Sequence, residues 1–337
     1  MHIHELLADG AAAFPQGGGW SRRRALTAGD ILGHADLRDV LRRQFGLLLD
    51  GLVVDPRLAV MLATQKRLLM GHAGLALCLR AGRPGRAGSV SRARFSELIS
   101  LHDLASRRAV DAFVRDMLAC GYAKHRVDTS DRRTQPIEPT EAGLNAVGAW
   151  LIVHLSMLDR LDGRSGSGSR LSVFLDTPDA LALLQPAVSD RLLSSWHVRE
   201  LEHAAALGFW LHGGGLDAEP LFAGLDTCVP ATGRIPVGIL SIATMAGTLG
   251  LSRWELTNNL RDAEAAGRIG WSGRRGRSQA WISGGLLREY TLAEAIRLAI
   301  VDDAFADCFG EIGLAQRPTA ALARKSEAAA TPAASSR

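Results

Sequence analysis

The chain has 337 residues, enough for two domains of ordinary size. Hydrophobic residues make up 47% of the chain and charged residues 22%, which excludes a disordered protein. The formal net charge is only +4, so any anion-binding surface must come from local clusters of arginine rather than from bulk charge.

The cysteines Cys78, Cys120, Cys228 and Cys308 are far apart in sequence and predict neither a disulfide framework nor a thiol zinc site. The histidines lack metal-ligand spacing, and no nucleotide-binding loop or nucleophile motif is present. Charged residues interrupt every apolar run before about 18 residues, and the N-terminus lacks the basic residues of a signal peptide. We therefore expect a cytoplasmic, soluble protein without membrane contact, cofactor or enzymatic activity.

Helical periodicity dominates residues 36–79, with a break at Asp55-Pro56, and a short helix is predicted over 95–101. A longer helix should begin after Ser106 and end at Gly121, where glycine suits the left-handed cap. Its apolar residues recur at helical spacing and predict one buried stripe, made of Val110, Phe113, Val114, Met117 and Leu118. Two short strands, 122–127 and 135–137, should follow and flank a basic turn.

The Gly- and Ser-rich segment 163–170 has the composition of a flexible linker. It divides the chain into predicted domains at 25–162 and 171–312, followed by a disordered tail at 313–337. The second half begins with a helical stretch at 178–212 and then repeats the plan of the first half. Ser252 lies 252 − 106 = 146 residues after Ser106, and Gly267 lies 267 − 121 = 146 residues after Gly121. Strands at 269–271 and 280–282 should flank a second basic turn.

The first half resembles the winged helix-turn-helix of the MarR family of bacterial transcription regulators over roughly residues 60–160. The resemblance is carried by a pattern typical of that family's wing, which here consists of Asp131, Arg133, Ile137, Thr140 and Gly143. Pro139 replaces the usual leucine, and Pro136 removes a strand donor, which predicts a short or edge second strand. The second half is similar only to winged helices in general and lacks the Asp-x-Arg pattern.

The resemblance implies a mainly α fold with small β wings, organised as tandem winged helix-turn-helix domains. It also implies binding to double-stranded DNA, since a major groove about 12 Å wide admits one helix while a basic wing reaches the neighbouring minor groove. The residues predicted to bind DNA in the first half are Ser106, Arg107, Arg108, Asp111, Arg115, Asp131, Arg132 and Arg133. Those in the second half are Ser252, Arg253, Thr257, Asn258, Arg261, Arg274, Arg275 and Arg277. The three arginines of the second wing have no acidic neighbour in sequence, and two glycines predict a mobile tip.

Family members generally act as symmetric dimers, so a tandem chain is expected to act as an intramolecular pseudo-dimer or as a homodimer with four modules. Two other functions stay open: a winged-helix protein that binds protein partners, and a sensor whose helices enclose a pocket for a small-molecule effector. Three tryptophans also give expectations. Trp254 is expected to pack rather than protrude, and Trp271 and Trp281 to face each other across the hairpin.

Overall fold

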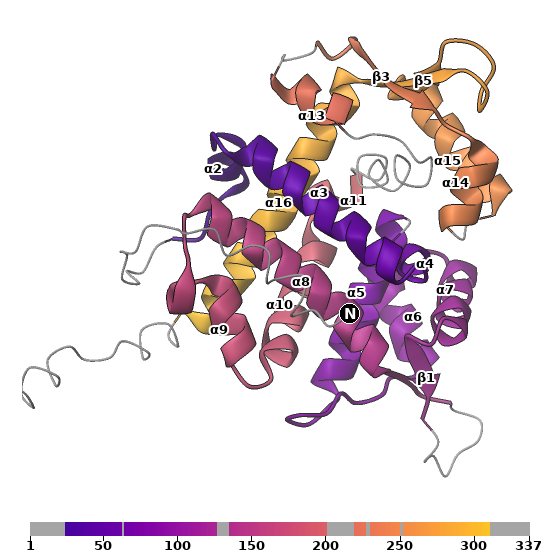
Figure 1. Ribbon diagram of the computed structural model, residues 1–337. Helices are drawn as coiled ribbons and strands as arrows, with labels where there is room; N and C mark the ends of the chain where they lie inside the picture. The colour runs from indigo at the N-terminus through magenta and orange to yellow at the C-terminus, as the bar shows by residue number, and fades with distance from the viewer. Residues whose placement is uncertain are drawn as a thin grey trace, which may run out of the picture.

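The computed structural model describes residues 24–62, 64–126, 135–200, 219–226, 230–249 and 252–310. Over these residues the protein is mostly helical and carries one two-stranded and one three-stranded antiparallel sheet (Figure 1). The expected mainly α fold with small β elements is confirmed at this level.

The first half contains seven described helices and one strand pair. Its elements are α2 (Ala28–Leu32), α3 (Leu37–Val54), α4 (Leu58–Leu62), α5 (Gln65–Arg80), α6 (Arg92–Leu101), α7 (Arg107–Ala119), β1 (Ala123–His125), β2 (Ile137–Pro139) and α8 (Glu141–Leu161). The predicted break at Asp55-Pro56 separates α3 from α4, and the two helices predicted after residue 90 are confirmed as α6 and α7.

The second half follows a one-turn 3-10 helix, η1 (Gly166–Gly168). Its elements are α9 (Arg170–Asp176), α10 (Ala180–Ser194), α11 (Trp196–Glu200), α13 (Glu219–Asp226), β3 (Arg234–Ile239), α14 (Ile242–Leu249), α15 (Arg253–Ala265), β4 (Ile269–Trp271), β5 (Gln279–Ser283) and α16 (Gly284–Phe309). The helical stretch predicted at 178–212 is confirmed as far as residue 200, and its remainder lies outside the described residues.

The two halves share one topology. In the second half the strand order is β3-β5-β4. In the first half β2 pairs with β1 on one side and, through Ile137, with Val90 on the other, so that Val90 takes the place of β3. Helices α7 and α15 begin 253 − 107 = 146 residues apart and end 265 − 119 = 146 residues apart. The duplication predicted from the sequence is therefore also present in the backbone.

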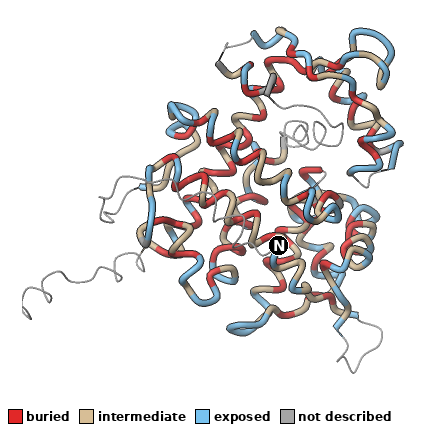
Figure 2. Tube along the Cα trace, viewed as in Figure 1, coloured by how far each residue is buried: buried red, intermediate tan, exposed pale blue. Residues whose placement is uncertain are grey.

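The two halves pack together through contacts between helices of one half and helices of the other. Helix α10 lies against α5, and the long helix α16 lies against α2, α8 and α10. Buried residues of both halves form one continuous hydrophobic cluster, seen as red segments running through the helices in Figure 2. The residues at 25–162 and 171–312 are thus two sequence units that share a core.

Segment 163–170 is a folded connection rather than the flexible linker that its composition predicts. Its last residue, Arg170, has only 4% of its side chain exposed and forms ion pairs with three acidic residues. Two of them, Asp159 and Asp162, belong to the end of α8, and Asp302 belongs to α16. Since a buried guanidinium must be paired, this cluster fixes the connection between the halves.

Among the described helices, one is long and apolar enough to cross a membrane when judged by length and composition alone, and it is α8. Such helices also occur in the cores of soluble proteins, and α8 packs against α3, α9 and α16. The structure is therefore compatible with the soluble protein expected from the sequence.

Candidate nucleic-acid interface

Helix α7 presents a polar first turn to solvent because its other face is buried. The Oγ of Ser106 accepts a hydrogen bond from the backbone N–H of Ala109 at 3.3 Å and caps the helix. The predicted stripe is confirmed at Val110, Phe113, Val114 and Met117, while Leu118 is half-buried. Ser106, Arg107, Arg108, Asp111 and Arg115 are all exposed.

The C-terminal end of α7 is held by a cluster that sequence reasoning missed. The Arg57 guanidinium donates to the carbonyl of Cys120, the C-cap residue of α7, at 3.2 Å and pairs with Asp55 at 2.7 Å. The hydroxyl of Tyr122 donates to the same carboxylate at 2.9 Å. The hydrogen bond from Arg57 lowers the pKa of Asp55, and burial raises the pKa of Tyr122. A charged pair therefore ties the end of α7 to the loop before α4.

A second ion pair ties the middle of α7 to α5. Arg67 contacts the carboxylate of Asp116 at 2.6 Å, and its guanidinium lies 5.6 Å from the centroid of the Phe113 ring. The guanidinium thus bridges the ring of a buried residue and a carboxylate at the surface. Helix α7 is fixed at two points on its inner side, which leaves its first turn free to contact another molecule.

The base of the first hairpin depends on the side chain of Thr140 and on the lack of one at Gly143. Thr140 caps α8 by accepting from the N–H of Gly143, and its hydroxyl donates to the carbonyl of Gly121 at 2.6 Å. A Cβ at Gly143 would lie 2.2 Å from the backbone oxygen of Tyr122, so only glycine fits. Strand β2 is short, as predicted, but it pairs on both sides and is not an edge.

The tip of this hairpin, residues 127–134, lies outside the described residues. The predicted site residues Asp131, Arg132 and Arg133 belong to it, so their role stays a prediction. Within the described base, Lys124 pairs with Glu138 across the two strands at 3.3 Å.

Helix α15 is the counterpart of α7. Leu256, Leu260 and Ala263 are fully buried, as predicted, while Ser252, Arg253 and Arg261 are exposed. Thr257 and Asn258 are half-buried, and the Thr257 hydroxyl donates to the carbonyl of Arg253.

Trp254 corrects the expectation that it packs. Its side chain is 76% exposed, at the position equivalent to Arg108, since 254 − 146 = 108. The first turn of α15 faces solvent, so no neighbouring element covers the large ring of Trp254. The positions of the buried residues in α15 already indicated that this turn faces solvent.

The second hairpin is better fixed than the sequence predicted. Arg275 forms an ion pair with Glu264 of α15, and its guanidinium lies 5.5 Å from the centroid of the Trp271 ring. The Oγ of Ser278 accepts from the N–H of Gly273 at 3.0 Å and donates to the carbonyl of Arg274, which closes the tip into a tight turn. Arg275 therefore has an acidic partner, contrary to the expectation for the wing arginines, whereas Arg274 and Arg277 are exposed.

Trp271 and Trp281 do not face each other across the hairpin. Trp271 is opposite Ala280, and Trp281 is opposite Gly270, one residue farther along. Adjacent positions on a strand point to opposite faces of the sheet, so the rings lie on different faces. Trp281 instead covers Gly270, where a Cβ would lie 2.3 Å from the ring, and receives the guanidinium of Arg234 at 4.3 Å.

Arg80, outside the predicted interface, has a structural role. Arg80 pairs with Asp190 of α10 at 2.5 Å and donates to the carbonyl of Pro186, so it joins the halves. Within the described chain, no group of three or more His, Cys, Asp or Glu side chains could hold a metal ion. Comparison of the sequence and the structure with family models, curated proteins and solved structures returned no match.

Proposed function

We propose that the protein is a DNA-binding transcription regulator, related to the MarR family, with two winged helix-turn-helix modules acting as an intramolecular pseudo-dimer. The observation that carries this proposal is the equivalence of α7 and α15. Both belong to units of the same topology, and both expose their first turn. In Figure 1 they lie on the same side of the molecule, with the second hairpin above them and the first below.

The arrangement suits a duplex because it provides two exposed helices and two hairpins for one long ligand. Helix α14 contacts α4, and α4 contacts α7, so the two units are joined by direct packing near these helices. Arg107 and Arg108 of α7 form no ion pair within the described part of the chain, and both are exposed. Unpaired guanidinium groups on a helix of groove-compatible width favour phosphate and base contacts.

The test is selection of binding sites from random duplexes, followed by salt titrations on the selected site. Replacing Arg107 and Arg108 by alanine should weaken binding and lower the slope of log affinity against log salt by up to about two units, since each phosphate contact contributes about 0.9. The matched control replaces Arg83 and Arg86, which are exposed in the turn after α5 and change the net charge equally. Failure to enrich any duplex, or equal effects of the two double variants, would refute the proposal.

The second candidate function is a module that binds a protein partner, and the exposed Trp254 favours it. Tryptophan is enriched at protein interfaces and among the residues that dominate binding energy there, and the Trp254 side chain is 76% exposed. On the DNA proposal the same ring contacts a base, with the methyl group of thymine as the apolar target. Replacing thymine by uracil in the selected site distinguishes the two functions. If Trp254 contacts the thymine methyl group, the uracil duplex should bind the wild type more weakly, and Trp254→Ala should abolish this difference. If Trp254 binds a protein partner, the replacement should not change duplex binding.

A further inference from the structure

A side chain of the second unit holds the turn between α6 and α7, the two helices of the proposed helix-turn-helix in the first unit. The guanidinium of Arg199, in α11, donates a hydrogen bond to the carbonyl of His102 at 2.6 Å. His102 is the C-cap residue of α6 and lies 97 positions earlier in the chain. The contact therefore joins the second half of the chain to the turn that precedes the exposed end of α7.

The carbonyl of His102 is a favourable partner for a cation. The last carbonyl groups of a helix lack partners within it and carry a partial negative charge. The residue after the cap, Asp103, has a φ angle of 48°, in the left-handed region that residues other than glycine seldom adopt. Arg199 thus supplies a donor and a positive charge beside a backbone conformation that needs support from its surroundings.

Helix α11 is itself fixed by buried polar groups of α5 and α16. The side chain of Gln65, in α5, is 2% exposed. Its amide group donates to the carbonyl of Val198 at 3.1 Å and accepts from Arg297 of α16 at 3.0 Å. Arg297 is also buried and pairs with Glu294, one turn earlier in α16. Because buried polar groups keep the partners that satisfy them, Arg199 projects from a backbone held in one place.

Helix α16 links α11 to the second hairpin and to α15. It contacts α11 and β5, β5 pairs with β4, and β4 contacts α15. The connection between β5 and α16 is tight, because Ser283 ends the strand and caps the helix by accepting from the N–H of Leu286 at 3.1 Å. A series of packed elements therefore runs from α15 to the turn before α7.

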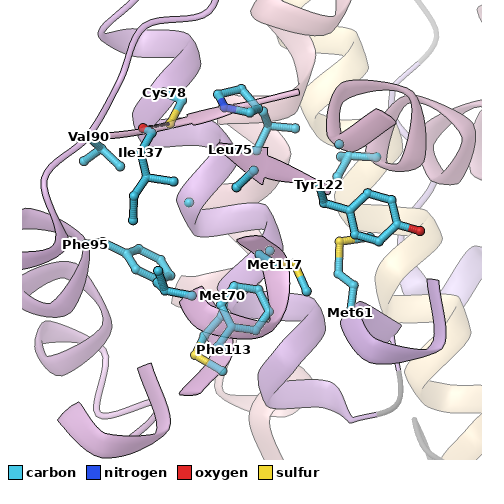
Figure 3. Close-up of a pocket in the computed structure, with 17 residues that line it drawn as sticks. Met61, Met70, Leu75, Cys78, Val90, Phe95, Phe113, Met117, Tyr122 and Ile137 are labelled. Carbon is cyan, nitrogen blue, oxygen red and sulfur yellow. Dashed lines mark hydrogen bonds between the residues drawn. The ribbon is translucent and has the colours of Figure 1, made fainter. Parts of the chain in front are cut away.

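In the first unit, α6, the turn and α7 act as one body because their inner faces pack together. The rings of Phe95 in α6 and Phe113 in α7 lie with their centroids 6.3 Å apart in the core of this unit (Figure 3). Ile99 and Val110, on either side of the turn, are buried as well. A hydrogen bond to the carbonyl of His102 therefore acts on the first turn of α7 as well as on α6.

We propose that Arg199 is a positioning residue for duplex binding: it fixes α7 relative to α15 and so sets the spacing of the two half-sites. The inference rests on the proposed function, in which both helices contact one duplex. Each base pair advances the duplex by about 3.4 Å and rotates it by about a tenth of a turn. Two helices held at a fixed separation therefore match one spacing, whereas two helices that move relative to each other match several.

The test compares wild type with Arg199→Met, which keeps an unbranched apolar side chain and removes the donor and the charge. Affinity is measured for the selected duplex and for duplexes with one base pair inserted or removed between the two halves. Each change of spacing should weaken binding by the wild type about tenfold or more and binding by Arg199→Met less than about threefold. Base substitutions within either half should weaken both proteins by equal factors, because the residues that face the duplex are unchanged.

Two further variants separate positioning from a general loss of stability. Arg80→Met removes another arginine that joins the halves, but Arg80 binds α10 rather than α6 or α7, so the spacing preference of the wild type should remain. Arg199→Lys keeps the charge and a donor and should restore part of that preference; it also replaces Arg199→Met if the latter does not fold. A uniform loss of affinity at every spacing in Arg199→Met, or relaxed spacing in Arg80→Met as well, would overturn the proposal.

Hydrogen exchange tests the contact without DNA. The N–H of Asp103 donates to the carbonyl of Ser100 at 3.0 Å, and the N–H of Leu104 donates to that of Ile99 at 3.1 Å. Both amide protons should exchange about tenfold faster in Arg199→Met and at the wild-type rate in Arg80→Met. Unchanged exchange in Arg199→Met would overturn the hold on the turn. If the wild type selects no duplex, the proposed function fails, and the exchange rates still decide whether Arg199 fixes the turn.

Discussion

Two buried histidines should make the fold sensitive to mild acid. His72 of α5 and His154 of α8 are each 1% exposed, and their ring centroids lie 4.6 and 3.7 Å from that of Trp150. Burial is the main cause that lowers the pKa of both imidazoles from 6.5 to about 3. His154 contributes to the lowering at His72, and the charge of Arg297 contributes at both rings. Neither ring nitrogen of His72 has a hydrogen-bond partner among the described residues. Both side chains are therefore neutral in the folded protein near pH 7.

The magnitude follows from the difference in protonation between the folded and unfolded states. An unfolded imidazole takes up a proton as the pH falls below about 6.5, whereas the folded one stays neutral down to about pH 3. The unfolded state thus binds more protons in this range, and the free energy of unfolding falls as the pH decreases. Below about pH 6.5 each histidine contributes about 1.4 kcal/mol per pH unit. Over the roughly 1.5 units down to pH 5 the two together therefore remove about 4 kcal/mol. Since domains are stable by only about 5 to 15 kcal/mol, the effect is large.

The assay is urea unfolding at pH 7, 6 and 5, comparing wild type with the double variant His72→Leu/His154→Leu. The double variant should lose about 4 kcal/mol less than wild type between pH 7 and pH 5. Comparing slopes removes any change in stability that the substitutions cause at pH 7. The control is His197→Leu, because His197 is exposed and its substitution should leave the pH dependence unchanged. The same pH dependence in wild type and the double variant would refute the reasoning.

Two further predictions use matched variants at the hairpins. Gly143→Ala places a Cβ 2.2 Å from a backbone oxygen and should lower the free energy of unfolding by about 1 to 3 kcal/mol. Gly148→Ala, in the same helix, adds a Cβ that meets nothing within 4 Å and should raise the free energy of unfolding by up to about 1 kcal/mol. Urea unfolding at pH 7 measures both changes, and changes of the same sign would contradict the steric argument. On the DNA proposal, Arg274→Ala/Arg277→Ala should weaken binding to the selected site and to random duplexes by similar factors and lower the salt slope by up to about two units, while Arg275→Ala should change the slope less because this guanidinium is already paired. Salt titrations on both duplexes decide the point, and a loss confined to the selected site would show that the second hairpin reads sequence.

The features predicted correctly from the sequence are those set by local patterns. The spacing of Val110, Phe113, Val114 and Met117 determines which face of α7 is buried, and Ser106 before this stripe determines where the helix begins. The repeated unit was also predictable, because glycine follows each of the two helices at equivalent positions. Gly121 and Gly267 both adopt the positive φ angles that this position requires.

The features missed depend on contacts between distant parts of the chain. Arg170 belongs to a segment with the composition of a linker, but it pairs with Asp302, 132 residues away. Arg275 lacks an acidic neighbour in sequence and finds Glu264 on the preceding helix. The composition of a segment indicates how flexible its backbone is in isolation. An interaction with a distant residue in the folded protein can fix the same segment in one conformation. Trp254 is a different case, because the buried positions Leu256, Leu260 and Ala263 already leave its turn of α15 facing solvent.

Helices α7 and α15 are similar on most of their inner faces, whereas their outer faces share some residues and differ in others. On the inner face, Val110, Val114 and Met117 correspond to Leu256, Leu260 and Ala263, all of them apolar and buried, whereas the buried Phe113 corresponds to the half-buried Asn259. On the outer face, Ser106, Arg107 and Arg115 correspond to the identical residues Ser252, Arg253 and Arg261. Arg108, Asp111 and Ala112 correspond to Trp254, Thr257 and Asn258, three changes of chemical class. Two identical outer faces would favour a palindromic site, as in a symmetric dimer. If the proposed function holds, these two faces require a site whose halves differ in sequence, and recovery of a perfect palindrome by selection would show that only one of the two helices reads bases.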